Sequence, residues 1–254
     1  MEQFDLSGRV ALITGGNSGI GLGMARGLAK AGADVAIWGT NEAKNDAAAE
    51  ELRSFGGSVL ALRCDVSDEE QVEAAFAETV ARLGRVDSCF ANAGVGSRAK
   101  AFVDTSLEDW RAILSVNLDG TFLTLRAAAR QMIAQGDGGR LVVTSSTAVI
   151  MGQARGEAYA ASKGGHVAMV KALAVEMARY GITANALIPG WIDTPLAAPA
   201  LNWKKFADNV MPRIPQRRWG RPEDFEGIAV YLASDASAYH TGDAIVIDGA
   251  FTIF

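Results

Sequence analysis

Residues 14–21 read Thr14-Gly15-Gly16-Asn17-Ser18-Gly19-Ile20-Gly21, a glycine-rich stretch with a strand pattern before it and a helix pattern after it. Val10–Thr14 is an apolar run typical of a buried parallel strand, and Leu22–Ala31 carries apolar residues at helical spacing. A turn of small residues between them lets the backbone approach a pyrophosphate, which then lies at the positive end of the helix. The spacing T-G-x-x-x-G-x-G differs from the commoner G-x-G-x-x-G, and glycines alone would also suit a plain turn. In this context the stretch predicts a dinucleotide-binding α/β protein.

Strand and helix patterns alternate along the whole chain, with no repeat, low-complexity tract or flexible linker between them. Because parallel strands are joined by right-handed helical crossovers, the alternation predicts a single α/β domain over residues 1–254 with a parallel sheet. Strand patterns occur at Val10–Thr14, Asp34–Trp38, Val59–Arg63, Ser88–Ala91, Arg140–Thr144, Thr183–Ile188 and Ala244–Ile247. Helix patterns occur at Gly21–Ala31, Glu42–Ser54, Glu69–Leu83, Leu107–Gln135, Glu157–Tyr180 and Pro222–Ala233.

The least regular part of the sequence is a proline-rich and tryptophan-rich segment at about residues 190–220. A long irregular segment in a compact domain is often a lid over a substrate site. The alternative is a surface excursion that is packed by its own aromatic side chains. We favour the lid.

The composition is that of a globular protein, with 49% hydrophobic and 21% charged residues. A net charge of −5 and a pI of about 5.2 give no electrostatic case for binding nucleic acid or an anionic membrane. No apolar stretch has membrane-spanning length, and the N-terminus lacks the regions of a signal peptide, so we expect a cytoplasmic protein. Cys64 and Cys89 are isolated, which predicts buried reduced thiols, and no spacing indicates a metal site.

A candidate catalytic group lies in the second half of the chain, where Tyr159 and Lys163 are four residues apart and Ser146 lies thirteen residues upstream. Residues four apart share one face of a helix. An ammonium on that face stabilises a phenolate, so we expect the pKa of Tyr159 to lie below its usual value of about 10. The spacing therefore predicts a tyrosine that acts as a general acid and base.

Together these motifs identify a resemblance to the short-chain dehydrogenase/reductase family, in its compact subgroup of about 250 residues. The resemblance extends from about Phe4 to the C-terminus. It implies a doubly wound, Rossmann-like fold with seven parallel strands, and reversible hydride transfer between a nicotinamide and an alcohol or ketone. It rests on the stretch 14–21 and on Asp65, Asn92-Ala93-Gly94, Asn117, Ser146, Tyr159, Lys163, Pro189-Gly190 and Asp248-Gly249.

The resemblance also implies four catalytic roles. Tyr159 is similar to the general acid and base, and Ser146 to the hydroxyl that orients and polarises the substrate oxygen. Lys163 is similar to the residue that binds the nicotinamide ribose and lowers the tyrosine pKa, and Asn117 to the residue that holds a water in the proton relay. Taken singly, each also suits a structural role, as a strand-end cap, a helix-kink residue or a surface helix residue. In this order and beside a cofactor turn, they indicate an active site.

The same resemblance implies a set of cofactor contacts at the carboxyl ends of the parallel strands. These are Gly15, Asn17, Ser18, Gly19, Ile20 and Gly21 in the turn, Thr40 after the second strand, Asp65 and Val66 after the third, Asn92, Ala93 and Gly94 after the fourth, Pro189, Gly190, Ile192 and Thr194 after the sixth, and Tyr159 with Lys163.

The residues after the second strand depart from both patterns that distinguish NAD from NADP in the family. NAD-specific relatives usually carry an Asp where this chain has Gly39. NADP-preferring relatives often carry a basic residue in place of Thr40 or Ser18. Because no carboxylate repels a 2′-phosphate and Gly39 leaves room for one, we favour NADP(H) over NAD(H).

Predicted substrate contacts are mostly apolar, which suits an alcohol or ketone with a sizeable carbon skeleton. They are Ser146, Ala148, Gln153, Arg155, Tyr159 and Trp191. Arg155 is the charged member, and either pairs with an anionic substrate or lies at the surface or a subunit interface. Ala127–Gln135 and Arg213–Gly220 resemble segments of sugar-acid dehydrogenases such as gluconate 5-dehydrogenases, and also of 3-oxoacyl-carrier-protein reductases and hydroxysteroid dehydrogenases.

Alternative functions are an NAD(P)-binding sensor without turnover, which would carry a broken catalytic set, and an epimerase or dehydratase of the longer relatives.

The helices Leu107–Gln135 and Glu157–Tyr180 carry small and apolar residues on more than one face, which need burial beyond one sheet contact. Relatives pair through these helices, so the resemblance implies a homotetramer.

Overall fold

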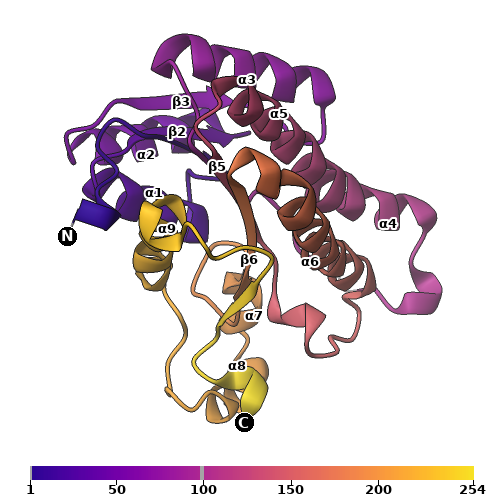
Figure 1. Cartoon of the computed structure of the whole chain (residues 1–254). Helices are drawn as coiled ribbons and strands as arrows, with labels where there is room; N and C mark the ends of the chain where they lie inside the picture. Colours follow the sequence, from indigo (N-terminus) through magenta and orange to yellow (C-terminus); the bar gives the residue numbers. More distant parts are fainter. Residues whose placement is uncertain (1, 98–99) are drawn as a thin grey trace.

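The computed structural model describes residues 2–97 and 100–254. A seven-stranded parallel sheet forms its centre, with strands in the order β3-β2-β1-β4-β5-β6-β7 (Figure 1). This is the predicted Rossmann-like sheet, and its order reverses between β1 and β4, where ligands bind in such folds. The strands are β1 (Val10–Thr14), β2 (Asp34–Gly39), β3 (Val59–Arg63), β4 (Ser88–Ala91), β5 (Gly139–Thr144), β6 (Ile182–Pro189) and β7 (Ala244–Ile247).

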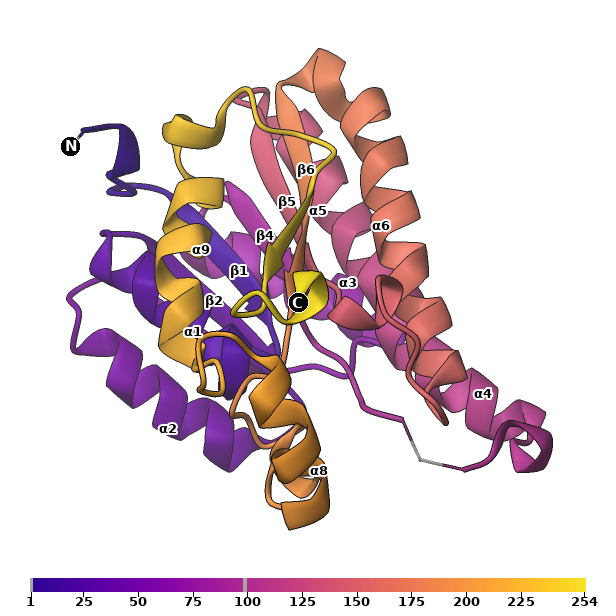
Figure 2. The same cartoon turned by 90° about the horizontal axis from the view of Figure 1, so that it is seen from below.

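Helices cover both faces of the sheet (Figure 2). On one face lie α1 (Gly19–Lys30), α2 (Glu42–Arg53) and α9 (Glu226–Ala233). On the other lie α3 (Glu69–Leu83), α4 (Leu107–Leu114), α5 (Gly120–Gln135) and α6 (Glu157–Met177). Successive side chains of a strand point to opposite faces, so the neighbours Leu12 and Ile13 are buried in different apolar cores. Cys64 and Cys89 are buried free thiols, as predicted.

Two segments differ from the prediction. The expected helix Leu107–Gln135 is divided by a π-helical turn at Ser115–Asp119. The segment expected to be irregular contains two short helices, α7 (Ala198–Leu201) and α8 (Lys204–Val210). Its rings pack on one another, since Trp191 and Phe206 meet edge to face with centroids 4.7 Å apart. Within the described ranges no helix has the length and apolar character needed to cross a bilayer.

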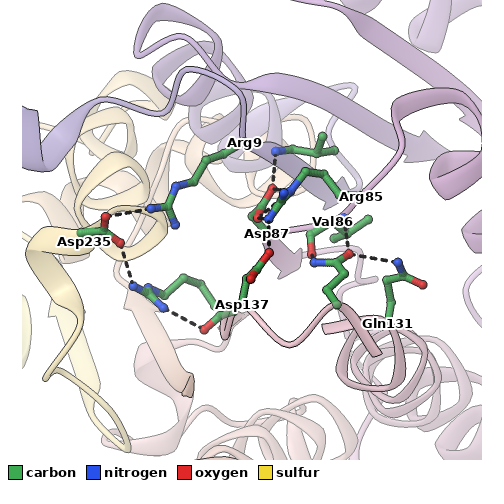
Figure 3. A network of polar contacts seen from close by, with 11 residues as sticks. Arg9, Arg85, Val86, Asp87, Gln131, Asp137 and Asp235 are labelled. Carbon is green, nitrogen blue, oxygen red and sulfur yellow. Dashed lines mark hydrogen bonds and ion pairs between the residues drawn. The ribbon is translucent and has the colours of Figure 1, made fainter. Parts of the chain in front are cut away.

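The amino ends of the strands are held by a polar network at the edge of the sheet remote from the glycine-rich turn (Figure 3). Asp87, which is buried, accepts a hydrogen bond of 2.8 Å from the backbone N–H of Val10 at the start of β1. Asp235 forms ion pairs with Arg9 at 2.7 Å and with Arg140 of β5 at 3.4 Å. This edge is therefore occupied by structural contacts. The network also contains Arg85, Val86, Gln131 and Asp137.

Candidate active site

Asn92 links neighbouring strand ends by hydrogen bonds at the position where the strand order of the sheet reverses. Its side-chain amide donates to the carbonyl of Thr14 at 3.0 Å, and its side-chain oxygen accepts from the hydroxyl of Thr144 at 3.0 Å. The Thr14 hydroxyl in turn accepts from the backbone N–H groups of Asn92 and Ala93, both at 3.0 Å. The carboxyl ends of β1, β4 and β5 are thus tied into one rim. Asn92 therefore has a structural role at this rim.

The glycine-rich turn closes against this rim without space for side chains. Gly15 has φ +65°, which L side chains rarely adopt. A Cβ on Gly21 would lie 2.2 Å from the carbonyl oxygen of Gly15, and one on Gly19 would lie 3.1 Å from Thr194. Ser18 is the N-cap of α1, and in the described coordinates its side chain does not cap the helix, so the first-turn N–H groups keep their anion-binding capacity. A cradle of this kind fits a dinucleotide pyrophosphate.

The space beside Gly39 is filled by two asparagine side chains, which corrects the expectation that this position is open. A Cβ on Gly39 would lie 2.2 Å from Asn17 Nδ2. Asn17 donates to Asn45 Oδ1 at 2.7 Å, and Asn45 donates to the carbonyls of Gly39 at 3.0 Å and Leu62 at 3.1 Å. The end of β2 therefore presents uncharged amides. Sequence reasoning missed Asn45, because nothing in its local pattern separates it from an exposed residue of α2.

Ser146 lies close enough to Tyr159 to influence the pKa of its hydroxyl. Ser146 follows β5 and caps a short 3₁₀ turn, accepting from the N–H of Ala148 at 3.1 Å. Burial raises the pKa of Tyr159, while a hydrogen bond with Ser146 acts in the opposite direction. The expected lowering of this pKa is therefore wrong for the protein without cofactor. The phenolate loses more from desolvation than it gains from its neighbours.

Lys163 lies one helical turn after Tyr159 on α6, and its Nζ is 5.6 Å from the centre of the Tyr159 ring. It is 3% exposed and donates to the carbonyl of Thr144 at 2.8 Å. Burial lowers the pKa of Lys163 to about 7. Its Nζ also lies close to Gly94, where a Cβ would be 3.6 Å away. The ammonium is thus held beside the rim by the Thr144 carbonyl.

Asn117 lies in the π-helical turn and is fully buried. Its side-chain oxygen accepts from the N–H of Val95 at 2.8 Å, and its amide donates to the Val95 carbonyl at 3.0 Å and to Ser162 Oγ at 3.2 Å. It therefore fixes the loop after β4 against the catalytic helix. The helix-kink role that the sequence leaves open is present, and the predicted relay water stays a prediction.

The other predicted cofactor positions lie along the same rim. The carboxylate of Asp65 accepts from Ser67 N–H at 3.0 Å and so shapes the turn before α3. Gly190 approaches Asp248 so closely that a Cβ would lie 2.7 Å from that residue's Cβ. Thr40 is exposed. Ile20 and Val66 pack in the two cores, and Pro189 ends β6 ahead of Ile192.

The predicted substrate residues differ in how far they are exposed. Gln153 and Arg155 are exposed. Arg155 has φ +62°, and its backbone N–H donates to Glu157 at 3.2 Å, so its backbone is the part held by neighbours. Trp191 lines a cavity of about 360 Å³ beside β7. That cavity was not predicted, and its lining includes Gln216, Arg218 and Asp224 but none of the four catalytic candidates.

A parallel sheet that reverses at a glycine cradle, with hydroxyl and ammonium groups at its carboxyl edge, defines the Rossmann-like class of dinucleotide-binding proteins. A family model described as enoyl-(acyl carrier protein) reductase matches residues 15–252. The chain belongs to the short-chain dehydrogenase/reductase family.

Similar proteins cover almost the whole chain. A 2-dehydro-3-deoxy-D-gluconate 5-dehydrogenase of Pseudoalteromonas atlantica is 36% identical over 252 residues, which are 99% of this chain and 98% of that protein. A 3-oxoacyl-[acyl-carrier-protein] reductase of Chlamydia pneumoniae is 37% identical over 247 residues, covering 97% and 98%. A solved gluconate 5-dehydrogenase of Burkholderia cenocepacia, in complex with NADP and tartrate, superposes with a TM-score of 0.93 at 38% identity, covering 99% and 98%.

Proposed function

We propose that this chain is an NADP(H)-dependent oxidoreductase that transfers a hydride between the nicotinamide and a secondary alcohol or ketone of a sugar acid. The observation that carries the proposal is the placement of Tyr159 near Ser146 and over the buried Lys163, on the same rim as the glycine cradle. A sensor without turnover has no need of this set, so the intact set favours an enzyme. The full-length similarity to named dehydrogenases supports the same conclusion.

In the proposed reaction, Tyr159, Ser146 and Lys163 each have a separate role that fits their contacts. The bound nicotinamide supplies the acceptor or donor of the hydride. In the oxidation, Tyr159 acts as a phenolate and takes the hydroxyl proton of the alcohol as the carbon gives up its hydride. In the reduction, Tyr159 acts as a phenol and gives its proton to the ketone oxygen, which leaves a phenolate. Ser146 donates a hydrogen bond to the same substrate oxygen and holds it over Tyr159. Lys163, with its pKa near 7, places a partial positive charge next to the developing phenolate.

NADP(H) is favoured by the uncharged end of β2. Gly39 and Asn17 present no carboxylate that would repel a 2′-phosphate, and Lys44 is exposed nearby at the start of α2. The Burkholderia cenocepacia relative was solved with NADP. These observations support a preference in spite of the filled space beside Gly39, because amide N–H groups are themselves phosphate donors.

A sugar acid is favoured as substrate because the two named sugar-acid relatives match the chain over its full length. A 3-oxoacyl or steroid-like ketone is the alternative, and a 3-oxoacyl reductase matches almost as well. The sequence leaves two roles open for Arg155, pairing with an anionic substrate or lying at the surface or a subunit interface. Its exposure supports the second role.

We also propose that residues 190–220 act as a lid, since Leu196 reaches across to Gly96 in the loop after β4.

The test compares initial rates of the purified protein with NADP⁺ and NAD⁺ on D-gluconate and 2-dehydro-3-deoxy-D-gluconate, and with NADPH and NADH on a 3-oxoacyl thioester and a steroid ketone. We expect the highest kcat/KM with a sugar acid and NADP(H), with a preference over NAD(H) of about tenfold or more. A tenfold preference for NAD(H) contradicts the cofactor assignment. Tight nicotinamide binding without turnover on any class would favour the sensor.

The predicted homotetramer is also a proposal for this chain, together with the cytoplasmic location. Phe122 on α5 and Val175 on α6 are exposed apolar side chains, 47% and 83% accessible. Apolar side chains on these helices are the kind that a subunit interface buries. Light scattering at micromolar concentration is expected to give four times the chain mass of 26.7 kDa. A monomeric mass would exclude the assembly.

A further inference from the structure

His166 lies one helical turn beyond Lys163 on α6 and is fully buried. Its Nε2 lies 2.7 Å from the backbone carbonyl oxygen of Asn117 and 3.2 Å from the hydroxyl of Thr121. A carbonyl oxygen accepts hydrogen bonds and cannot donate, so Nε2 carries the hydrogen. This contact defines the tautomer of the ring, with Nδ1 as the unprotonated nitrogen.

The ring is held neutral in this position. Burial, together with the charge of Lys163, lowers the pKa of His166 to about 3. The backbone carbonyls of Asn117 and Thr144 act in the opposite direction. Nδ1 is buried and finds no hydrogen-bond partner among the described residues. His166 is therefore a donor through Nε2.

Nearly all hydrogen-bonding positions of the Asn117 carbonyl and side chain have partners in this arrangement. Its carbonyl oxygen accepts from His166 Nε2 and from the Thr121 hydroxyl, each at 2.7 Å, which accounts for both lone pairs. Its side-chain amide donates both hydrogens, to Val95 and Ser162. In the described contacts one lone pair of Oδ1 remains, because the other accepts from Val95. The architecture gives Asn117 a role in holding the loop after β4.

The π-helical turn at Ser115–Asp119 needs these side-chain donors. A π turn widens the helix and is less stable than an α-helical turn, so it persists where other contacts hold it. Relaxation to an ordinary α-helical register would shift the residues in the turn by one position and rotate Asn117 away from Val95. Val95 follows Gly94, where a Cβ would lie 3.2 Å from Asn117 Oδ1 and 3.6 Å from Lys163 Nζ.

We propose that His166 is a positioning residue of the active site: its Nε2–H holds the Asn117 carbonyl, keeps the π turn open and so keeps Asn117 and Gly94 in place beside Lys163. The role is distinct from a proton relay, because the ring stays neutral while Tyr159 exchanges a proton with the substrate. It rests on the proposed oxidoreductase activity for its kinetic consequence, and on the fold alone for the tautomer.

The kinetic experiment compares H166Q, which keeps an N–H donor near the position of Nε2, with H166L, which has similar size and no donor. We expect H166L to lower kcat about tenfold, the usual scale for one buried hydrogen bond. The Kd for NADPH is expected to change less than threefold, because the cradle is fastened separately through Asn92. H166Q is expected to stay within about threefold of the wild type.

Two controls make the result decisive. H240Q alters the other histidine, a half-buried residue that pairs with Asp243 at 2.9 Å and lies outside the proposed site, and is expected to leave kcat unchanged. T121V removes the second donor to the Asn117 carbonyl and is expected to lower kcat about threefold, so it replaces H166L should that variant not fold. A folded H166L or T121V with wild-type kcat overturns the proposal, as does H166Q falling as far as H166L.

A spectroscopic measurement tests the tautomer without any substrate. The chain has two histidines, so ¹⁵N-imidazole NMR yields two ring systems that H166Q and H240Q assign. We expect His166 as the Nε2–H tautomer, neutral from about pH 5 to pH 8. An Nδ1–H tautomer, or protonation of the His166 ring in this range, overturns the proposal even where the enzyme assay finds no substrate. A failure of the proposed activity alone would leave the NMR result as expected.

Discussion

Replacing Tyr159 with phenylalanine is expected to lower kcat by about a hundredfold to ten-thousandfold, because the proton transfer to the substrate oxygen loses its acid and base. The ring remains, so its packing over Lys163 is kept and the Kd for NADPH is expected to change less than about twofold. The measurement is kcat with the best substrate of the panel, together with a fluorescence titration of NADPH.

The matched control is Y239F, since Tyr239 is fully exposed and loses only a surface hydroxyl. Y239F is expected to keep the wild-type kcat. A Y159F enzyme within about fivefold of the wild type would show that another group moves the proton, and would remove the basis of the proposed mechanism.

Replacing Gly21 with alanine is expected to weaken NADPH binding by at least about tenfold and to destabilise the fold by about 1–3 kcal/mol. The added Cβ would lie 2.2 Å from the Gly15 carbonyl oxygen and 2.5 Å from the Asn92 amide nitrogen. Both neighbours belong to the fastened rim and cannot turn aside as a flexible side chain would. Thermal unfolding with and without NADPH measures the two effects together.

G227A provides the control for the same chemical change. Gly227 lies in α9 with no described atom within 4 Å of a Cβ built there. Alanine in an exposed helical position stabilises by about 0.5–1 kcal/mol relative to glycine, so we expect a small increase in Tm and an unchanged Kd for NADPH. Equal Kd values for G21A and the wild type would show that the turn does not bind the cofactor.

Local patterns were sufficient to predict the sheet. Strands β1, β3, β4 and β7 have the predicted bounds, since each is a short apolar run between turn residues. The helix break at Ser115–Asp119 was not predictable in this way, because it is held by Val95 and His166 from distant parts of the chain. Helical propensity around Asn117 carries no sign of those partners.

In the candidate site, too, some features follow from local sequence patterns and others depend on residues that are distant in the chain. The order of motifs predicts an active site that contains Ser146 and Tyr159, and Ser146 lies close enough to Tyr159 to influence its pKa. The direction of the Tyr159 pKa was predicted wrongly, because spacing along a helix says nothing of desolvation or of the Thr144 carbonyl that takes the Lys163 ammonium. His166 had one available signal, a single histidine one turn after Lys163, but its partners come from the three-dimensional fold.

The segment between β6 and α9 begins and ends at one point of backbone pairing. Ile192 pairs with Gly220, with hydrogen bonds from Asp193 N–H to the Gly220 carbonyl at 2.8 Å and from Gly220 N–H to the Trp191 carbonyl at 2.9 Å. Val210 and Ile214 inside this segment share a small apolar core with Phe251 near the C-terminus, and the Arg213 guanidinium lies over the Phe251 ring at 4.9 Å. An opening of the proposed lid about this paired point would therefore have to separate these side chains from Phe251 or carry the C-terminal residues with it.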